Sequence, residues 1–150
     1  MRVVTLAIVT AIAVSLTAST ALSAPKKPSI KDEDGLSHYH PKDSDSSDIC
    51  VKLKGKPGQK IRVQLVFGAG DVLEDDEFKL PGKTAKKKKR GKLLLSFEIF
   101  SAGPYEFLVG KSDADQASDS ADYVVPPPPP DGAKMGPFKC PGKTVTKGWG

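Results

Sequence analysis

The sequence predicts an all-β protein: a small antiparallel β-sandwich or open barrel of about five to seven strands, closed by one disulfide. Three stretches alternate apolar and polar residues with a period of two, at Ile49–Lys54, Ile61–Phe67 and Lys92–Val109. Gly- and Pro-rich segments separate them, and no helix of ordinary length is visible after the N-terminal region. This pattern of short strands and turns is typical of a sandwich or barrel.

The third stretch contains two of these strands. Its first half places its apolar residues on one parity, and its second half does the same after the break at Ser101-Ala102-Gly103-Pro104. Gly tolerates positive φ and Pro donates no ladder hydrogen bond, so the break is a turn. We therefore expect a β-hairpin here, and a second hairpin in which Gly55-Lys56-Pro57-Gly58 joins the strands at Ile49–Lys54 and Ile61–Phe67.

Three further segments complete the predicted domain, residues 49–125. Val72–Leu80 is expected to be a short edge strand or one helical turn, and Lys111–Ala121 a loop. Tyr123-Val124-Val125 is expected to be a final short strand. The predicted core consists of the residues that share the apolar parity of each strand. They are Ile49, Val51, Leu53, Ile61, Val63, Leu65, Phe67, Leu93, Leu95, Phe97, Ile99, Tyr105, Phe107 and Val109.

The two ends of the chain differ in composition from the domain. Residues 1–23 have a charged start, an apolar run and a small-residue end, which is the pattern of a secretory signal peptide. Its removal takes away Arg2, so the formal net charge falls from +5 to +4. Residues 24–48 are expected to form a disordered polar arm, because they carry few apolar residues. Residues 126–150 are a Pro/Gly-rich tail whose Pro126–Pro130 run favours a polyproline II rod.

Cys50 and Cys140 are the chain's two cysteines. In a secreted chain an even pair most simply forms one disulfide, which here would tie the tail back to the first strand. Two free thiols are the alternative, and a zinc site is disfavoured because no further ligands stand at the usual spacing. Cys50 has the parity opposite to that of Val51 and Leu53, so we expect it at a sheet edge and outside the core.

The strongest local feature is a run of cations between residues 83 and 92. Seven of its ten residues are basic: Lys83, Lys86, Lys87, Lys88, Lys89, Arg90 and Lys92. Three interpretations stay open. The run is a solvated loop, a nuclear import signal of a protein that enters another organism's cell, or a patch that binds anions such as acidic polysaccharide, nucleic acid backbone or membrane headgroups. No aromatic residue interrupts the lysines, which argues against stacking of bases.

Acidic residues and histidines give weaker signals. Asp71, Glu74, Asp75, Asp76 and Glu77 are expected to neutralise the basic run. His38-Tyr39-His40 would present two imidazoles on one side of an extended chain, but no second cluster completes a metal shell, so we predict no metal and no cofactor.

No catalytic motif is visible, and the protein is predicted not to be an enzyme. A Ser–His pair would require the arm to fold back, since both histidines lie in it. The aromatic residues Tyr39, Tyr105, Tyr123 and Trp149 could contact sugars, but the sequence gives them no common surface.

The signal peptide, the short all-β chain and the two distant cysteines together resemble small secreted effector proteins of plant-colonising fungi. Cys50-Val51-Lys52-Leu53, followed by a turn and Ile61–Phe67, is similar to the opening strands of the MAX-type effectors. The resemblance implies non-enzymatic binding of a host protein that modulates immunity or virulence, after secretion and translocation into the host cell. The alternative is a secreted cell-wall or matrix protein that binds polysaccharide through the basic loop.

Overall fold

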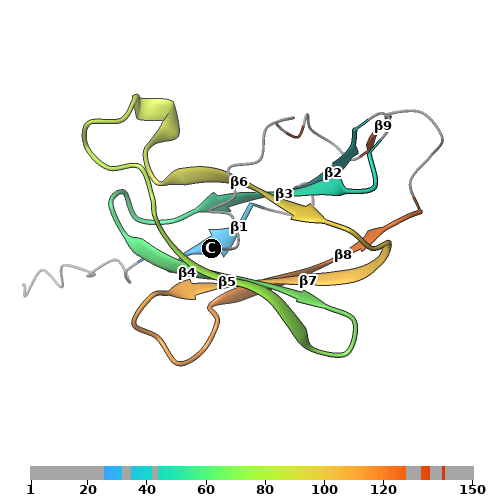
Figure 1. Cartoon of the computed structure of the whole chain (residues 1–150). Coiled ribbons are helices and arrows are strands. Elements are labelled where there is room, and N and C mark those ends of the chain that lie inside the picture. Colours follow the sequence, from blue (N-terminus) through green and yellow to red (C-terminus); the bar gives the residue numbers. More distant parts are fainter. Residues whose placement is uncertain (1–25, 32–34, 42–43, 128–132, 136–139, 141–150) are drawn as a thin grey trace, which may run out of the picture.

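The computed structural model describes residues 26–31, 35–41, 44–127, 133–135 and 140. These residues form nine β-strands and one short 3₁₀ helix, Lys87–Lys89 (Figure 1). The strands are β1 (Ser29–Ile30), β2 (Leu36–His40), β3 (Ser47–Lys54), β4 (Lys60–Phe67), β5 (Asp71–Lys79), β6 (Lys92–Ile99), β7 (Gly103–Lys111), β8 (Asp119–Val125) and β9 (Ala133–Met135). The predicted all-β class is confirmed. The strand count exceeds the expected five to seven because β1, β2 and β9 lie in the predicted arm and tail, outside the predicted domain.

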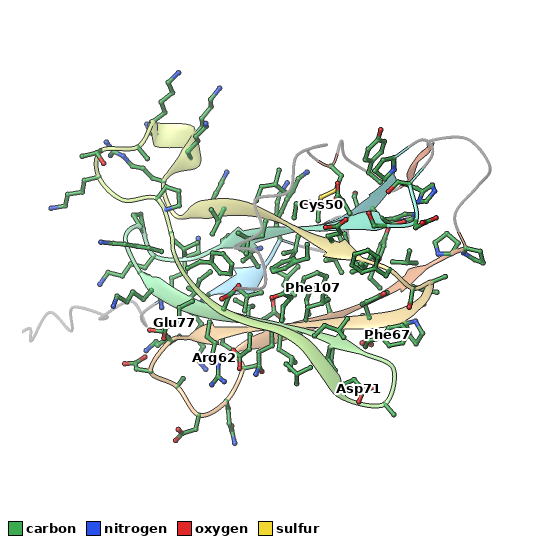
Figure 2. All side chains as sticks on the ribbon, in the orientation of Figure 1. Cys50, Arg62, Phe67, Asp71, Glu77 and Phe107 are labelled. Carbon is green, nitrogen blue, oxygen red and sulfur yellow. A yellow bond between two sulfur atoms is a disulfide. The ribbon has the colours of Figure 1, made fainter. Side chains whose placement is uncertain are left out.

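The strands make two antiparallel sheets that pack face to face. In sheet I, β3 is central: β6 pairs along one edge, β1 and β2 pair along the other, and β9 adds to β2. Sheet II has the order β5-β4-β7-β8. Phe107 lies between the sheets in Figure 2 and is fully buried. Its ring lies 5.7 Å from that of Phe97 on the facing sheet.

This strand order is that of an immunoglobulin-like sandwich, with β3 and β6 on one sheet and β4, β5, β7 and β8 on the other. A second hallmark of that architecture is present at the start of β7. The Tyr105 hydroxyl donates a hydrogen bond to the Ser101 carbonyl oxygen at 2.6 Å, which fixes the corner where the chain crosses from β6 to β7. This contact is the tyrosine corner of such sandwiches.

Both predicted hairpins are wrong in their pairing. β3 pairs with β6 and β4 pairs with β7, so each turn crosses between the sheets and does not close a hairpin. Period-two alternation gives each strand one inward-facing side, whether the next strand lies beside it in the same sheet or across the core in the facing sheet. Alternation therefore cannot distinguish a hairpin from a crossing between the sheets. The strands that do form hairpins are β4 with β5 and β7 with β8.

The predicted core is confirmed: its residues are buried, with Phe67 and Leu93 half-buried. Four further apolar residues complete it: Ile30, Leu36, Leu80 and Val125. The expectation of a disordered arm is wrong where the arm is described, because β1 and β2 lie in it and bury Ile30 and Leu36. The short strand expected at Tyr123–Val125 begins earlier, at Asp119, so the predicted loop is shorter. Residues 1–23, and with them the predicted signal peptide, lie outside the described residues.

Candidate functional site: a lysine groove on sheet I

The basic run is held as a closed loop against the end of the sandwich. Leu80, which is 1% exposed, anchors its first end: its carbonyl accepts from Gly58 N–H at 3.0 Å, and its own N–H donates to the Gln59 carbonyl at 2.9 Å. The loop closes where Gly91 N–H donates to the Pro81 carbonyl at 2.9 Å. Residues 81–91 therefore leave and re-enter the sandwich at neighbouring points, as an Ω-type loop does.

Gly91 fixes the second end of the loop. Its carbonyl accepts from Gly55 N–H at 2.8 Å, and its φ is +65°, in the left-handed region that favours glycine. A Cβ at this position would lie 2.3 Å from the Gly55 carbonyl oxygen. No side chain fits there without moving backbone, so this glycine is a geometric requirement for docking the loop on the β3–β4 turn.

A groove of about 740 Å³ lies where this loop meets sheet I. Three lysines of the run, Lys88, Lys89 and Lys92, line it together with three lysines from other elements, at the end of β1 and on β3. Those three are Lys31, Lys52 and Lys54, and the apolar lining consists of Leu53, Pro81, Leu93 and Leu94. None of the described residues that line the groove is acidic. We call this feature the lysine groove.

The structure divides the predicted basic patch into two groups. Lys88, Lys89 and Lys92 line the groove, whereas Lys83, Lys86, Lys87 and Arg90 do not. Arg90 is used inside the loop, where its Nε donates to the Ala85 carbonyl at 3.1 Å. Figure 2 shows nitrogen-tipped side chains reaching outward from this loop. The seven cations of the run therefore do not all line one groove.

Sequence reasoning missed half of the groove lysines. Lys52 and Lys54 follow Cys50 on the outward parity of β3, so alternation alone places them on the outer face. Nothing in the sequence indicates that β6, and with it the basic loop, would pair beside them. Lys31 lies at the end of β1, in the segment predicted to be disordered, and its N–H donates to the Lys52 carbonyl at 2.8 Å.

The prediction that the acidic segment neutralises the basic run is wrong about which cation the segment pairs with. The acids lie on β5, in sheet II, where Asp75 forms a two-point ion pair with Arg62 of β4. Gln64 Nε2 donates to the same carboxylate at 2.9 Å. The Arg62 guanidinium holds the pKa of Asp75 below its usual value, whereas burial and the nearby Asp76 raise the pKa of Glu74.

Both histidines of the arm belong to the sandwich interior. Their side chains share one side of β2, and each has a hydrogen-bond partner: His38 Nδ1 lies 2.8 Å from the Tyr123 hydroxyl, and His40 Nδ1 lies 2.9 Å from Ser47 Oγ. Burial, reinforced by His40, lowers the pKa of His38. In the described residues no group of three or more His, Cys, Asp or Glu side chains could hold a metal ion.

The fold does bring a serine to a histidine, at Ser47 and His40. Within the described residues neither imidazole hydrogen-bonds to a carboxylate that could orient it. Tyr105 and Tyr123 stand opposite each other on β7 and β8 and face the core, so they form no exposed sugar-binding surface. Tyr105 is buried in its corner and Tyr123 bonds to His38 between the sheets, while Trp149 lies outside the described residues.

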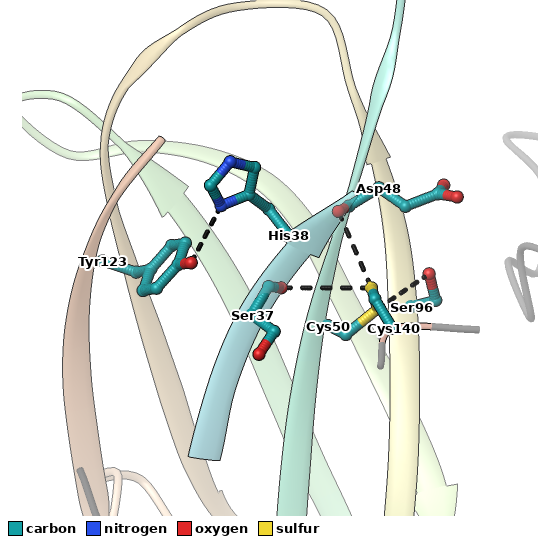
Figure 3. Close-up of a disulfide and its surroundings, with 7 residues drawn as sticks. All are labelled: Ser37, His38, Asp48, Cys50, Ser96, Tyr123 and Cys140. Carbon is teal, nitrogen blue, oxygen red and sulfur yellow. Dashed lines mark hydrogen bonds between the residues drawn. A yellow bond between two sulfur atoms is a disulfide. The ribbon is translucent and has the colours of Figure 1, made fainter. Parts of the chain in front are cut away.

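The predicted disulfide joins Cys50 to Cys140 on the outer face of sheet I (Figure 3). Its Cα atoms are 5.8 Å apart. Cys50 has the predicted outward parity but sits on the central strand, not at a sheet edge, and is fully buried. Its cross-strand neighbours Ser37 and Ser96 are also fully buried, and Cys50 Sγ lies 3.4 Å from Ser96 Oγ. We call Ser37, Cys50, Ser96 and Asp48 the covered patch.

Comparison with known proteins identifies no family. No protein-family description and no curated protein matches the sequence. Among solved structures, β-glucosidase from Kluyveromyces marxianus in complex with glucose aligns with a TM-score of 0.33 and 13% identity, over 74% of this chain and 15% of that chain. The selenomethionine-labelled form of that enzyme aligns with a TM-score of 0.34 and 13% identity, over 74% and 14% of the two chains. Such values carry no argument about this protein. No helix in the described part of the chain is long and apolar enough to cross a membrane.

Proposed function

We propose that this is a secreted, non-catalytic binding protein whose lysine groove holds a segment of acidic polysaccharide. The main support for the proposal is that lysines from distant parts of the sequence line one cavity. Lys31 from the end of β1 and Lys52 and Lys54 from β3 meet three lysines of a sequence-distant loop around one cavity. The charged residues among the described lining are all lysines, and a concave site lined by charge of one sign focuses the electrostatic field and attracts a polyanion more strongly than separated charges would.

The apolar lining supports a sugar as the ligand. Pro81 and Leu94 lie among the lysines, and Leu94 is 36% exposed on the outer face of β6. Carboxylates or sulfates of an acidic sugar chain would meet the ammonium groups, while the C–H faces of its rings would cover the apolar side chains. No described lining residue is aromatic, so stacking of nucleic acid bases is disfavoured.

A second depression near the same end is a poorer candidate. It is lined by four lysines, Lys26, Lys56, Lys60 and Lys111, but also by Asp113. A carboxylate in the wall repels an anionic ligand and neutralises part of the positive charge. These lysines therefore supply a control.

The test is calorimetric titration of the disulfide-bonded protein with heparin oligosaccharide and with oligogalacturonate. Lys31→Ala/Lys89→Ala should weaken binding at least about fivefold and flatten its salt dependence, because two charge contacts are lost. Lys60→Ala/Lys111→Ala, which removes the same charge from the second depression, should change affinity less than about twofold. Equal losses in the two double variants would contradict the proposal, and so would tighter binding of a single-stranded oligonucleotide than of either sugar.

The resemblance to effectors predicts a host protein as partner, and the basic run predicts nuclear import. Both stay predictions. They are separable from the groove, because an import receptor reads the unbroken run Lys86–Arg90, of which only Lys88 and Lys89 line the groove. Replacing Lys86 and Lys87 should therefore impair nuclear enrichment of the signal-free protein while leaving sugar binding intact.

A further inference from the structure

The loop that carries the basic run is held at its two ends and loosely bonded between them. Residues 80–91 form the longest connection between successive strands from β3 to β8, and the loop projects from the end of the sandwich (Figure 1). Residues 86–90 are all exposed. Their backbone N–H groups bond only within the loop: Lys89 donates to the Lys86 carbonyl at 2.8 Å, and Arg90 to the Lys87 carbonyl at 3.4 Å. Such a segment opens at low free energy, and exposed loops are the preferred sites of proteolytic nicking.

A protease that cuts after basic residues would find its accessible sites in this loop. Within residues 44–127 the basic residues outside it lie in strands, whose paired backbone cannot enter a protease cleft, apart from Lys56. Lys56 precedes Pro57, and a proline after the cut position blocks such proteases. The residues in strands are Lys52, Lys54, Lys60, Arg62, Lys79, Lys92 and Lys111.

The loop also holds the only tract of adjacent basic residues that no proline follows. Residues 86–90 are consecutive cations, and the other adjacent pair in the sequence, Lys26-Lys27, is followed by Pro28. Residues 80–91 include no acidic residue, so no side chain of the loop repels the carboxylates with which a protease binds basic side chains. Composition and placement therefore both favour cleavage here by a protease that recognises paired basic residues.

A cut in this loop leaves the two pieces of the sandwich joined. It falls between β5 and β6, with Cys50 before it and Cys140 after it, so the disulfide connects the two products. Two long strand pairs also cross the cut, β3 with β6 and β4 with β7. The rings of Phe78 and Phe97, 6.4 Å apart, pack across it as well. The product is therefore a two-chain protein with the same core.

We propose that Lys86–Arg90 is a processing site for a serine protease specific for paired basic residues, and that the cut releases Lys88 and Lys89 from the lysine groove. Hydrolysis of one peptide bond that follows residues 87–90 consumes one water. The acyl carbon takes the hydroxyl group and becomes a carboxylate, and the amide nitrogen leaves as an ammonium group. No oxidant, reductant or cofactor is needed.

The release follows from the loss of the closed loop. After the cut the loop lysines stand on free chain ends, whereas Lys31, Lys52 and Lys54 keep their places on β1 and β3. Fewer fixed charges then line the groove, so its affinity for a polyanion falls. This second half of the proposal rests on the proposed function, because it assumes that the groove holds acidic sugar. The cleavage itself does not depend on that function.

The experiment is limited digestion of the disulfide-bonded protein, residues 24–150, with a serine protease that cleaves after Lys-Arg and Lys-Lys pairs. Wild type should stay one band on a non-reducing gel, give two bands on a reducing gel and keep its circular dichroism spectrum, with the new ends mapped to residues 87–91 by mass spectrometry. Lys87→Gln/Lys89→Gln leaves no adjacent basic pair in the loop and should slow the cut at least about tenfold. Lys79→Gln/Lys83→Gln removes the same charge beside the pairs and should change the rate less than about twofold.

Three outcomes would overturn the processing site. Wild type that resists the protease, under conditions that cut the reduced and unfolded chain, shows that the loop does not open. Equal rates in the two double variants show that net charge and not the basic pairs directs the cut. A cut protein that loses its β spectrum shows that cleavage destroys the sandwich.

Titration of intact and cut protein with heparin oligosaccharide tests the release separately. The cut protein should bind at least about threefold more weakly. Equal affinity before and after the cut would overturn the release. An intact protein that does not bind heparin or oligogalacturonate would instead contradict the proposed function, and the digestion result would still decide the processing site.

Discussion

The outer face of sheet I has two halves that look alike in sequence and differ in what lies on them. On β3 the outward residues are Cys50 in one half and Lys52 in the next, and on β6 they are Ser96 and Leu94. Cys50 and Ser96 are fully buried next to Cys140 in the covered patch, whereas Leu94 lies open in the lysine groove. Alternation predicts which residues point outward. Contacts made by segments distant in sequence decide whether the outward-facing residues are buried or line an open groove.

The largest expected effect on stability comes from removing the disulfide of the covered patch. Cys50→Ser/Cys140→Ser removes a cross-link between residues 90 positions apart, and loop-closure entropy predicts a loss of about 4–5 kcal/mol in the free energy of unfolding. The measurement is urea denaturation of wild type and double variant. Because the covered half and the groove are separate, the variant should still bind acidic sugar under conditions in which it is folded. An unchanged unfolding midpoint would show that the disulfide does not hold the patch.

Gly91→Ala tests the half of the face that holds the lysine groove, without changing any charge. The substitution forces a Cβ toward the Gly55 carbonyl at a left-handed backbone position, so it should lower stability by about 1–3 kcal/mol. It should also weaken sugar binding, since Lys88 and Lys89 then lose their fixed place over β3. Paired thermal melts and titrations check both effects. Wild-type affinity in this variant would mean that a linear run of lysines is enough and that the groove geometry is irrelevant.

These two variants also indicate what the sequence could and could not predict. The all-β class, the core parity and the Cys50–Cys140 bond follow from local alternation and from cysteine arithmetic, and Phe97, Phe107 and Val51 lie where alternation puts them. The pairing of β3 with β6 could not be predicted, because a turn of four residues is compatible with a hairpin or with a crossing between sheets. The groove depends on that pairing. The two lysine pairs that line the groove, Lys52 with Lys54 and Lys88 with Lys89, are therefore visible in the sequence. That they lie close together in the fold is not.

A smaller effect tests the electrostatics of the covered patch. Burial, with the nearby Glu98, raises the pKa of Asp48 above its usual value of 3.8. A raised carboxyl pKa means that the folded protein holds the proton more tightly, so this group favours folding at low pH and costs stability once the pH rises above the folded pKa. Asp48→Asn should therefore raise the free energy of unfolding at pH 7 by up to about 1 kcal/mol and change it little near pH 3. A destabilised variant at pH 7 would show that the carboxylate has a stabilising partner.

The most direct test of the central claim compares two double variants within one loop. Lys88→Ala/Lys89→Ala and Lys86→Ala/Lys87→Ala remove the same charge from adjacent positions, and only the first pair lines the groove. All four side chains are exposed, so neither double variant should change the melting temperature measurably. The groove predicts that the first variant loses at least about fivefold in affinity for acidic oligosaccharide while the second stays within about twofold of wild type. Equal losses in the two variants would contradict it, because they would show that the ligand senses the net charge of the loop and not the site built where the loop meets the sheet.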